Sequence, residues 1–489
     1  MTIVFKKKDD VYLQAIEGER SDLKMLSEYF TFEVEGAKFS PAYRNKYWDG
    51  KIRLFNTNDM TIYAGLTHDI IKFSKLMDVE VEFEGTRYDF PGREQPLEDE
   101  FAEGFLKALD VHSGGKPIEH RDYQVHAFKQ ALRKQRCLLL SPTASGKSLI
   151  IYSLMRWWRE ISDRKILIIV PTIGLVGQMI SDFKDYSNGK FNDVQGIQGG
   201  TTKEVNSSVV VSTWQSIYKM PLSWFAQFGS VVVDEVHTAT AKSLKGIMEK
   251  LIVCPDRVGL TGTLQEAKTN ELVLKGLFGP IEKMISTKEL MDRDQISKMK
   301  IQMVQFDYSE EDRKAVSKLD YQGEIDFLVN HEKRNKIIAK MASTLPGNTL
   351  VIFQRIEHGK NLFDRLETEK QTYYVAGETD KDTREVTRQM AEDNEVIIVA
   401  SLGVFSTGIS IKNLHNLIFA HPTKSKIKVL QSIGRILRKH DSKEEATVFD
   451  IVDDLKNGQR QNFALRHANE RFKYYSNENF DYKINTVKL

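Results

Sequence analysis

The stretch S-P-T-A-S-G-K-S, from Ser141 to Ser148, decides the fold of this 489-residue chain. It follows a short apolar run, Cys137 to Leu140, and precedes an amphipathic stretch, Leu149 to Trp158, so it lies between a predicted strand and a predicted helix. A turn in that context directs backbone N–H groups toward an anion at the helix N-terminus. The sequence therefore predicts a phosphate-binding loop at the edge of a parallel α/β sheet.

The residues of this loop have separate predicted roles. We expect Lys147 to reach the β- and γ-phosphates of a nucleotide and the Ser148 hydroxyl to ligate Mg²⁺. The rest of the predicted cradle is Thr143, Ser145 and Gly146. The loop departs from the usual G-x-x-x-x-G-K-S pattern at its first position, Ser141, and has Ala144 where many such loops have glycine. A surface turn that ends in Gly-Lys-Ser is the alternative interpretation.

A second motif, D-E-V-H from Asp234 to His237, closes the apolar run Ser230 to Val233. A buried parallel strand would deliver this motif to the carboxyl edge of the sheet, where ligands bind in open α/β folds. We expect Asp234 to be the outer-sphere carboxylate of Mg²⁺ and Glu235 to polarise an attacking water, with His237 in the same catalytic set. An ordinary acidic turn is the alternative, and the apolar run before the motif disfavours it.

A third motif, Q-S-I-G-R-I-L-R from Gln431 to Arg438, lies on a predicted helix. Arg435 and Arg438 are three residues apart and therefore share one face of that helix. Arginines presented to a γ-phosphate neutralise the charge that develops during phosphoryl transfer, and we place Gln431 in the same catalytic set. A solvated basic helix is the alternative, but the three motifs together predict a motor driven by nucleotide hydrolysis.

The order of these motifs resembles that of superfamily 2 helicases over roughly residues 115–455. The resemblance implies that Gln124 reads the edge of an adenine base, while Arg121 or Tyr123 stacks on it. It implies that Gly408 touches the nucleotide. It also implies a motif that couples hydrolysis to movement, made of Thr261, Gly262 and Thr263.

The same resemblance implies a set of residues that hold the nucleic-acid backbone through hydroxyl, amide and N–H donors. They are Pro171, Thr172, Gln178, Gly200 and Thr213 in the first half of the motor, and Ser401 and Thr407 in the second half. Contacts of this kind position a strand and do not read its sequence. Within the family, the chain is similar to bacteriophage recombination and repair helicases. This implies work on forks, Holliday junctions and R-loops in recombination, repair and replication.

The N-terminal segment carries a basic and aromatic patch from Lys38 to Arg53. Its candidate nucleic-acid contacts are Arg44, Lys46, Tyr47 and Trp48, because rings stack on bases and cations pair with phosphates. A β-hairpin that turns at Asp49-Gly50, with its aromatic rings in a small core, is the alternative. The resemblance favours an accessory domain for substrate recognition.

Charge is divided unevenly along the chain. Residues 1–112 carry 15 Lys and Arg against 22 Asp and Glu, and subtraction from totals of 70 and 68 leaves 55 against 46 for the remainder. The motor portion is therefore the basic one, as a cleft that tracks phosphates requires. The only cysteines are Cys137 and Cys254, without spacing for a disulfide framework or a zinc site, and no apolar run approaches a membrane span. We expect a cytoplasmic protein, in a bacterial host if of phage origin.

Strand-like runs alternate with helical patterns in two sets. The first set is 137–140, 165–170, 209–212, 231–234 and 258–261, and the second is 349–353, 372–375, 396–400, 416–420 and 446–451. The predicted fold class is α/β, with two RecA-like parallel-sheet lobes, a small N-terminal α+β accessory domain and a short C-terminal helical tail. The predicted domains are 1–95, 96–280, 281–455 and 456–489. In the tail we expect a helix and an irregular end. Its aromatic residues would pack on the second lobe and its basic residues would face solvent, although guiding a strand is the alternative.

The sequence thus predicts a monomeric, ATP- and Mg²⁺-dependent DNA helicase that remodels branched DNA, with RNA–DNA hybrids as further candidate partners and no membrane contact. One alternative is an ATP-driven translocase on double-stranded DNA without net unwinding. Another is a strand-annealing or binding protein whose affinity the nucleotide switches. The set of Lys147, Glu235 and Arg438 argues against the switch, since a switch does not need an acid that activates water. RNA as the substrate stays open, because motors that track the backbone can ignore the 2′-OH.

Overall fold

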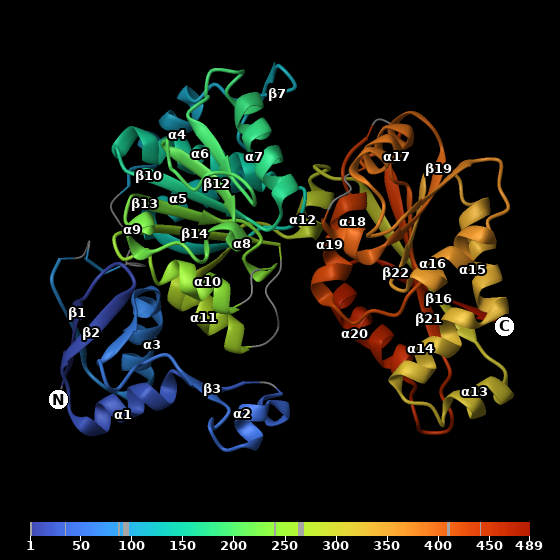
Figure 1. The fold of residues 1–489 in the computed structure, drawn as a ribbon, viewed down its shortest axis with the longest axis horizontal. Coiled ribbons are helices and arrows are strands. Elements are labelled where there is room, and N and C mark those ends of the chain that lie inside the picture. The colour runs from blue at the N-terminus through green and yellow to red at the C-terminus, as the bar shows by residue number, and fades with distance from the viewer. Residues whose placement is uncertain are drawn as a thin grey trace. The chain divides into compact units, whose positions relative to one another are not determined.

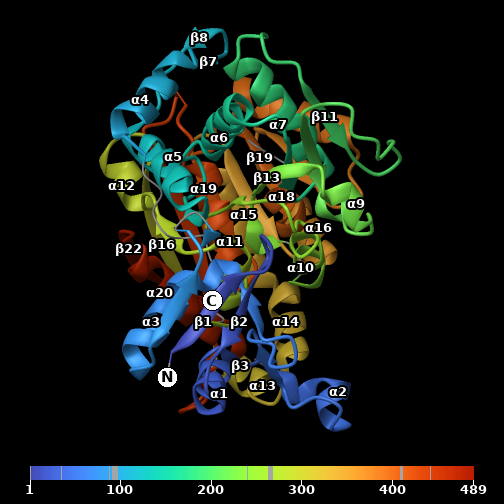
Figure 2. The same ribbon diagram turned by 90° about the vertical axis from the view of Figure 1, so that its left-hand side faces the viewer.

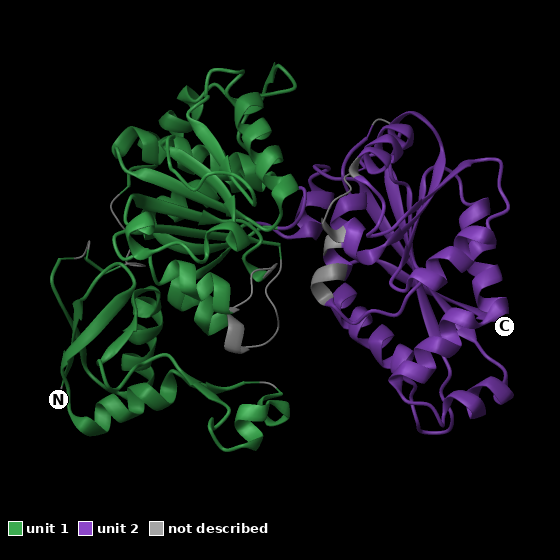
Figure 3. Cartoon of the chain, in the orientation of Figure 1, with its two compact units in different colours: residues 1–141, 146–284 green, residues 142–145, 285–489 purple. Residues whose placement is uncertain are grey.

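The computed structural model describes residues 2–34, 36–86, 89–90, 97–238, 241–262, 268–407, 411–440 and 442–489. The chain divides into two compact units, residues 1–141 with 146–284 and residues 142–145 with 285–489 (Figure 3). Two predicted site residues, Thr263 and Gly408, and the predicted boundary at residue 95 lie outside the described residues. Among the described residues, no helix is long and apolar enough to cross a membrane.

A small domain of mixed helices and strands begins the first unit (Figure 2). Its four-stranded sheet has the order β5-β2-β1-β6, in which β1 and β6 are parallel and the other pairs are antiparallel. The bounds are β1 Ile3–Lys7, β2 Tyr12–Glu17, β5 Thr61–Tyr63, β6 Val81–Glu84, α1 Arg20–Tyr29 and α3 Thr67–Met77. The alternate residues Ile3 and Phe5 on β1 are fully buried, so the two-residue period of the strand places one face on the core.

A two-stranded ribbon extends from this domain and carries the basic and aromatic patch. Strand β3 (Thr31–Glu33) pairs antiparallel with β4 (Lys51–Arg53), and α2 (Pro41–Arg44) lies in the connection. The alternative of a tight hairpin turn at Asp49-Gly50 is wrong, because these two residues only end a longer connection, directly before β4. Helix propensity and a serine cap at its start form α2 inside that connection instead of a tight turn.

The first lobe is a seven-stranded parallel sheet with the order β11-β12-β10-β13-β14-β9-β15 (Figure 1). Its strands are β9 Arg136–Leu140, β10 Lys165–Val170, β11 Val194–Ile197, β12 Val209–Thr213, β13 Phe228–Val233, β14 Asp256–Thr261 and β15 Ile281–Lys283. Its helices are α4 Asp99–Ala108, α5 Asp122–Lys134, α6 Lys147–Ile161, α7 Ile173–Tyr186, α8 Trp214–Ile217, α9 Leu222–Phe225, α10 Ala241–Met248 and α11 Lys268–Phe278. The five strands predicted for this lobe are confirmed. Continuous Val and Ile runs such as 166–170 are buried, as a parallel sheet covered by helices requires.

The second lobe repeats this plan with the order β18-β19-β17-β20-β21-β16-β22, again parallel throughout. Its strands are β16 Lys298–Asp307, β17 Thr349–Phe353, β18 Gln371–Val375, β19 Val396–Ser401, β20 Asn416–Phe419, β21 Glu445–Asp454 and β22 Tyr482–Lys488. Its helices are α12 Thr287–Asp292, α13 Glu310–Val316, α14 Tyr321–Asn330, α15 Glu332–Thr344, α16 Ile356–Asp364, α17 Lys381–Asp393, α18 Leu402–Thr407, α19 Lys426–Ile436 and α20 Phe463–Asn477. The five predicted strands are confirmed. The irregular end expected after the last helix is wrong, because residues 482–488 pair with 301–307 as an edge strand.

The N-terminal domain packs tightly on the first lobe within the same unit. Tyr12 and Tyr63 both donate hydrogen bonds to Glu249 Oε1, at 2.6 and 2.8 Å. A Cβ atom at Gly276 would lie 2.7 Å from the Tyr63 ring, and one at Gly65 would lie 2.3 Å from the carbonyl oxygen of residue 275. The accessory domain is therefore fixed to α11 and to Glu249 at the end of α10, the helices that follow the D-E-V-H and T-G motifs.

Candidate nucleotide and nucleic-acid site

The motifs of the first lobe meet at the carboxyl edge of its sheet. Ser141 follows β9 and donates its N–H to the Thr261 carbonyl at the end of β14, at 2.9 Å. Asp234 follows β13 and donates its N–H to the carbonyl of Ile169 on β10, at 2.8 Å. Strands β9 and β10 are consecutive in the chain but are separated in the sheet by β13 and β14. This change of strand order is the position at which open α/β sheets bind ligands.

Lys147 and Glu235 form the central contact of this edge. Lys147 Nζ donates to Glu235 Oε1 at 2.9 Å and to the Ser141 carbonyl at 3.4 Å. Their side chains are 11% and 19% exposed, so a ligand can reach the pair. Glu235 has a φ of +49°, in the left-handed region that non-glycine residues rarely adopt. Backbone strain of this kind is retained where the surrounding structure needs one specific side-chain direction.

The coupling motif contacts the same glutamate. His237 Nδ1 lies 2.6 Å from Thr261 Oγ1 and 3.4 Å from Glu235 Oε2. The Gly262 N–H also donates to the Glu235 carboxylate. The structure therefore brings together residues of the phosphate loop, the D-E-V-H motif and the T-G motif around one carboxylate.

The two adjacent acids have opposite electrostatic environments. Burial, reinforced by the charge of Glu235, raises the pKa of Asp234 well above its usual value. Burial also opposes ionisation of Glu235, but the neighbouring Lys147 ammonium outweighs it and lowers the pKa of Glu235. Glu235 is therefore an ionised hydrogen-bond acceptor, as polarisation of a water molecule requires. An added positive charge such as Mg²⁺ would lower the pKa of Asp234 and favour its ionised form.

The proposed magnesium ligands are one hydroxyl and one carboxylate. Ser148 Oγ lies 2.7 Å from Tyr186 OH, and burial raises the pKa of that tyrosine to about 12. Among the residues that the structure describes, no group of three or more His, Cys, Asp or Glu side chains could hold a metal. Ser148 and Asp234 nevertheless fit Mg²⁺, which commonly takes one or two protein oxygens and completes its shell with water and phosphate. Sequence reasoning missed Tyr186, because it lies 38 residues from Ser148 and no local spacing links them.

Backbone conformation explains the unusual composition of the phosphate loop. Ala144 and Gly146 have φ values of +67° and +77°. Ala144 thus occupies a left-handed position that favours glycine, while a Cβ at Gly146 would lie 2.4 Å from Gln124 Nε2. Ser145 Oγ donates to the Pro142 carbonyl at 2.7 Å. Thr143 is half-buried in the same turn.

The predicted adenine-reading residues form the start of α5. Gln124 is buried, its Oε1 accepts the Arg121 N–H at 2.9 Å, and its Nε2 donates to the Gly146 carbonyl at 3.4 Å. Arg121 Nη1 donates to Tyr123 OH at 3.0 Å. Gln124 thus links the N-terminus of α5 to the phosphate loop. Its side-chain oxygen is committed to capping that helix in this structure.

The predicted nucleic-acid residues of the first lobe differ in accessibility. Gln178 and Gly200 are exposed, and Pro171 is half-buried at the end of β10. Thr172 Oγ1 accepts the Leu175 N–H at 3.4 Å and caps α7. Thr213 is buried, with its hydroxyl 2.9 Å from Ser216 Oγ. Gln178, Gly200 and Pro171 are accessible to a nucleic-acid strand. The hydroxyls of Thr172 and Thr213 already make hydrogen bonds within the protein.

The arginine motif of the second lobe begins on α19, but the helix ends at Ile436, so the prediction that Arg435 and Arg438 share one helix face is wrong for Arg438. The Arg435 guanidinium lies 5.7 Å from the centre of the Phe405 ring on α18, which follows Ser401 at the end of β19. Arg438 is half-buried just beyond α19, and its carbonyl accepts a hydrogen bond from Ser297 Oγ at 3.2 Å. Gln431 is within α19 and Thr407 ends α18, but the described structure does not extend to their side chains.

The aromatic residues of the N-terminal patch are mostly exposed. Tyr47 is 87% and Phe39 is 71% exposed, so the alternative interpretation, in which the rings form a small core, is wrong for these two residues. Trp48 is half-buried, and its Nε1 donates to the Lys51 carbonyl at 2.8 Å. Arg44 and Lys46 face solvent. The patch therefore presents rings and cations together, with Trp48 holding its backbone.

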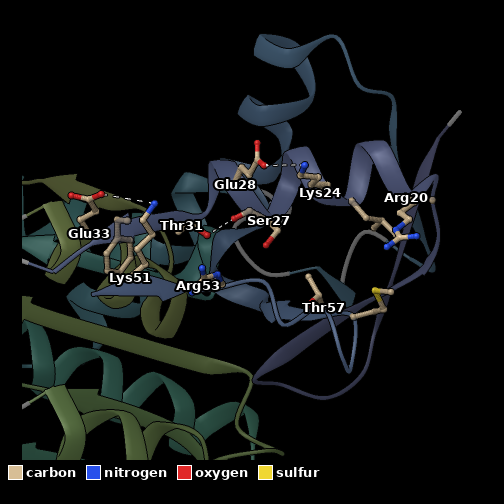
Figure 4. Close-up of a pocket in the computed structure, with 13 residues that line it drawn as sticks. Arg20, Lys24, Ser27, Glu28, Thr31, Glu33, Lys51, Arg53 and Thr57 are labelled. Atoms are coloured by element: carbon tan, nitrogen blue, oxygen red, sulfur yellow. Dashed lines mark hydrogen bonds and ion pairs between the residues drawn. The ribbon is translucent and has the colours of Figure 1, made fainter. Parts of the chain in front are cut away.

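A groove of about 1060 Å³ lies beside this patch, between α1 and the β3–β4 ribbon (Figure 4). Its cationic side chains are Arg20, Lys24, Lys51 and Arg53. Glu28 lies 3.8 Å from Lys24, and Glu33 lies 3.8 Å from Lys51. These acids offset part of the positive charge of the groove. The exposed aromatic rings of the patch are therefore a clearer indication of nucleic-acid contact than the groove is.

Comparisons with known proteins match the whole length of the chain. Residues 2–84 match the family described as DNA helicase UvsW, N-terminal; residues 117–266 match Type III restriction enzyme, res subunit; and residues 332–440 match Helicase conserved C-terminal domain. The chain is 39% identical to the ATP-dependent DNA helicase uvsW of Enterobacteria phage T4 over 97% of both proteins. The crystal structure of T4 UvsW is similar over 100% of both chains, with 38% identity and a TM-score of 0.55. The DNA 3'-5' translocase XPB2 of Sulfurisphaera tokodaii is 25% identical, over 68% of this chain and 82% of that protein.

Proposed function

We propose that this chain, which belongs to the UvsW family of ATP-dependent DNA helicases in superfamily 2, uses ATP and Mg²⁺ to unwind or remodel branched DNA. The observation that carries the proposal is the accessible contact between Lys147 and Glu235 at the carboxyl edge of the first sheet. It joins the group that would bind phosphate to the group that would activate water. A binding protein needs only the former.

The residues have complementary roles in this proposal. Lys147 exchanges Glu235 for the nucleotide phosphates, which frees the carboxylate to polarise the attacking water. Ser148 and Asp234 hold Mg²⁺, which supplies positive charge to the phosphate oxygens when bound. The Gly262 N–H and His237 keep Glu235 oriented. Arg435 and Arg438 stabilise the charge that develops on the γ-phosphate.

The N-terminal patch is the proposed contact with branched DNA. Exposed rings such as Tyr47 stack on unpaired bases, which occur at forks and junctions, and Arg44 and Lys46 pair with phosphates. Because the domain is fixed on α10 and α11, bound DNA would be held at a constant distance from the first lobe. We propose a monomer that acts in recombination, repair and replication in the cytoplasm of a bacterial host, with RNA–DNA hybrids as further substrates.

The test is ATP hydrolysis and strand separation measured together on a four-way junction, plain duplex and single-stranded DNA. Glu235→Gln should bind nucleotide and DNA but lose turnover, because an amide cannot act as the base. Glu160→Gln, an exposed position near the far end of α6, is the matched control and should behave as the unmodified protein.

Each outcome separates the candidate functions. Turnover and separation that are strongest on the junction support the branched-DNA helicase. Turnover on duplex without separation would instead assign a double-strand translocase, and no DNA-stimulated turnover would leave a nucleotide-switched binding protein. Normal hydrolysis by Glu235→Gln would contradict the assignment of the catalytic carboxylate.

A further inference from the structure

A short segment of the second lobe, residues 420–424, connects β20 to the arginine-bearing helix α19. Two fully buried arginines hold its backbone. Arg334 Nη2 donates to the Ala420 carbonyl at 2.7 Å, and Arg471 Nη1 donates to the Thr423 carbonyl at 2.9 Å. Tyr474 OH adds a hydrogen bond of 2.8 Å to the Lys424 carbonyl. Because α19 begins at residue 426, these bonds fix the position of its first turn.

Each of these arginines is itself anchored to a carboxylate on β21. Arg471 Nε and Nη2 donate to Asp450, with the shortest bond at 2.6 Å, and Tyr475 OH donates to the same carboxylate at 2.9 Å. Arg334 Nε and Nη2 donate to Asp453 at 2.7 and 3.0 Å. A guanidinium suits this arrangement, because its rigid fork can satisfy a carboxylate and still direct an N–H to a carbonyl.

The opposite end of α19 is also held. Lys443 Nζ donates to the Ile436 carbonyl at 2.6 Å and to the Lys412 carbonyl at 2.8 Å. The Ser297 N–H donates to the Leu437 carbonyl at 2.8 Å. Both ends of α19 are therefore held by hydrogen bonds. These bonds also fix the backbone positions of Arg435 and Arg438.

Helix α20 supplies the bonds nearest to the start of α19, although the two helices are separated in sequence by strand β21. Its own N-terminus is fixed by the buried Glu324 carboxylate, which accepts hydrogen bonds from the Asn462 side chain and from the N–H groups of Phe463 and Ala464. The sequence predicted that the basic residues of this tail face solvent, but Arg471 is fully buried. An arginine in that position acts on the neighbouring backbone, not on a DNA strand.

We propose that α20 is a positioning element of the motor, in which Arg471 and Tyr474 place α19 so that Arg435 and Arg438 can stabilise the transition state of hydrolysis. This inference rests on the proposed function of those two arginines. In this proposal, Arg471 and Tyr474 contact neither nucleotide nor DNA. The effect should therefore appear in kcat and not in the KM for ATP.

Two adjacent tyrosines of α20 provide a matched test on the full-length protein. Tyr474→Phe removes the bond to the Lys424 carbonyl and should lower the kcat of DNA-stimulated ATP hydrolysis about fivefold, with an unchanged KM and melting temperature. Tyr475→Phe makes the same chemical change but removes a bond to Asp450, to which Arg471 still donates through Nε and Nη2. It should therefore lower the melting temperature and leave kcat near that of the unmodified protein. An unchanged kcat in Tyr474→Phe, or an equal loss in both variants, would overturn the proposal.

A double-mutant cycle distinguishes positioning from a general structural effect. In a background that carries both Arg435→Ala and Arg438→Ala, Tyr474→Phe should cause no further loss of kcat, because both groups that it positions are absent. A repeated fivefold loss would show that Tyr474 acts through another route. Arg471→Lys, which keeps a charge beside Asp450 but lacks the fork, should lower kcat more than Tyr474→Phe, while Arg466→Ala on the exposed face of α20 should not.

The outcomes also separate this inference from the proposed function. If the unmodified protein hydrolyses ATP and Tyr474→Phe matches it, only the positioning role fails. If the unmodified protein shows no DNA-stimulated hydrolysis, the proposed function fails and the positioning role fails with it.

Discussion

The two lobes share a seven-stranded parallel sheet, but they use buried charge in opposite ways. In the first lobe, Lys147 and Glu235 remain 11% and 19% exposed at the carboxyl edge. In the second lobe, the pairs Arg334–Asp453 and Arg471–Asp450 are no more than 1% exposed. The same sheet plan therefore carries an ion pair that a ligand can exchange in one lobe and ion pairs that stay closed in the other.

This difference follows from the cost of separating buried charges. A pair with solvent access can change partners, because water and an incoming anion compensate the freed groups. A fully buried pair cannot open without leaving an uncompensated charge, so it serves only to fix geometry. We infer that the pair of the first lobe is suited to exchange of partners, whereas the buried pairs of the second lobe fix the geometry of that lobe.

The largest effect on hydrolysis is expected for Lys147→Ala, which tests whether the pair of the first lobe is functional and not structural. It should reduce kcat for ATP hydrolysis at least about 100-fold, because a preorganised charge on the phosphates is lost. The melting temperature should fall less than on removal of one partner of a second-lobe pair, because this pair keeps some solvent access. Phosphate release and thermal melting measure the two effects. A large loss of stability with retained hydrolysis would mean that this pair is as structural as those of the second lobe.

Arg334→Ala should show the reverse pattern. It leaves the buried Asp453 carboxylate without its cationic partner and should destabilise the fold by about 3 to 5 kcal/mol, as measured by denaturant unfolding. Its neighbour Lys333 is exposed, and Lys333→Ala should leave stability unchanged. Equal stability of the two variants would contradict the view that the second lobe depends on closed ion pairs.

Asp256 tests the effect of burial at the opposite edge of the first sheet, where β14 begins. Burial raises its pKa to about 7, although Ser230 and Arg136 partly oppose the shift. A raised carboxyl pKa means that the folded state holds its proton longer than the unfolded state, so wild-type stability falls as pH rises from about 4 to 7.

Asp256→Asn removes that titration and should stabilise the protein by up to about 4 kcal/mol at pH 8 relative to pH 4. Unfolding measured at both pH values tests this. Asp163→Asn, at an exposed position, serves as the control. A benefit of Asp256→Asn that is equal at both pH values would show that the carboxyl group is not buried as described.

The smallest effect concerns exposed groups, which neither lobe uses for its core. Tyr47→Ala should weaken junction binding by about 1 to 3 kcal/mol through lost stacking, with basal hydrolysis and melting temperature unchanged. Trp48→Ala should also disturb the patch backbone, because the indole N–H holds the Lys51 carbonyl. Binding titrations on a four-way junction would separate the two. Unchanged affinity of Tyr47→Ala would remove the patch from the DNA interface.

Much of the site could be predicted from the sequence because its signals are local. Short apolar runs before Asp234 and before Ser141 predict buried parallel strands, and parallel strands bring their carboxyl ends to one edge. The ten predicted strands are confirmed for this reason. The edge strand β22 could not be predicted in this way, since its residues are largely exposed and lack a continuous apolar run.

The sequence by itself determined the two sheets, the phosphate loop and the types of residue at the carboxyl edge, because each depends on neighbours within a few positions. Only the tertiary structure decided which charges meet. Tyr186 beside Ser148, Gly262 beside Glu235 and Arg471 beside Asp450 are pairings across distant segments. Such pairings depend on how helices pack over the sheet, and the free energy of a buried charge depends on its whole surroundings. No spacing along the chain encodes that environment.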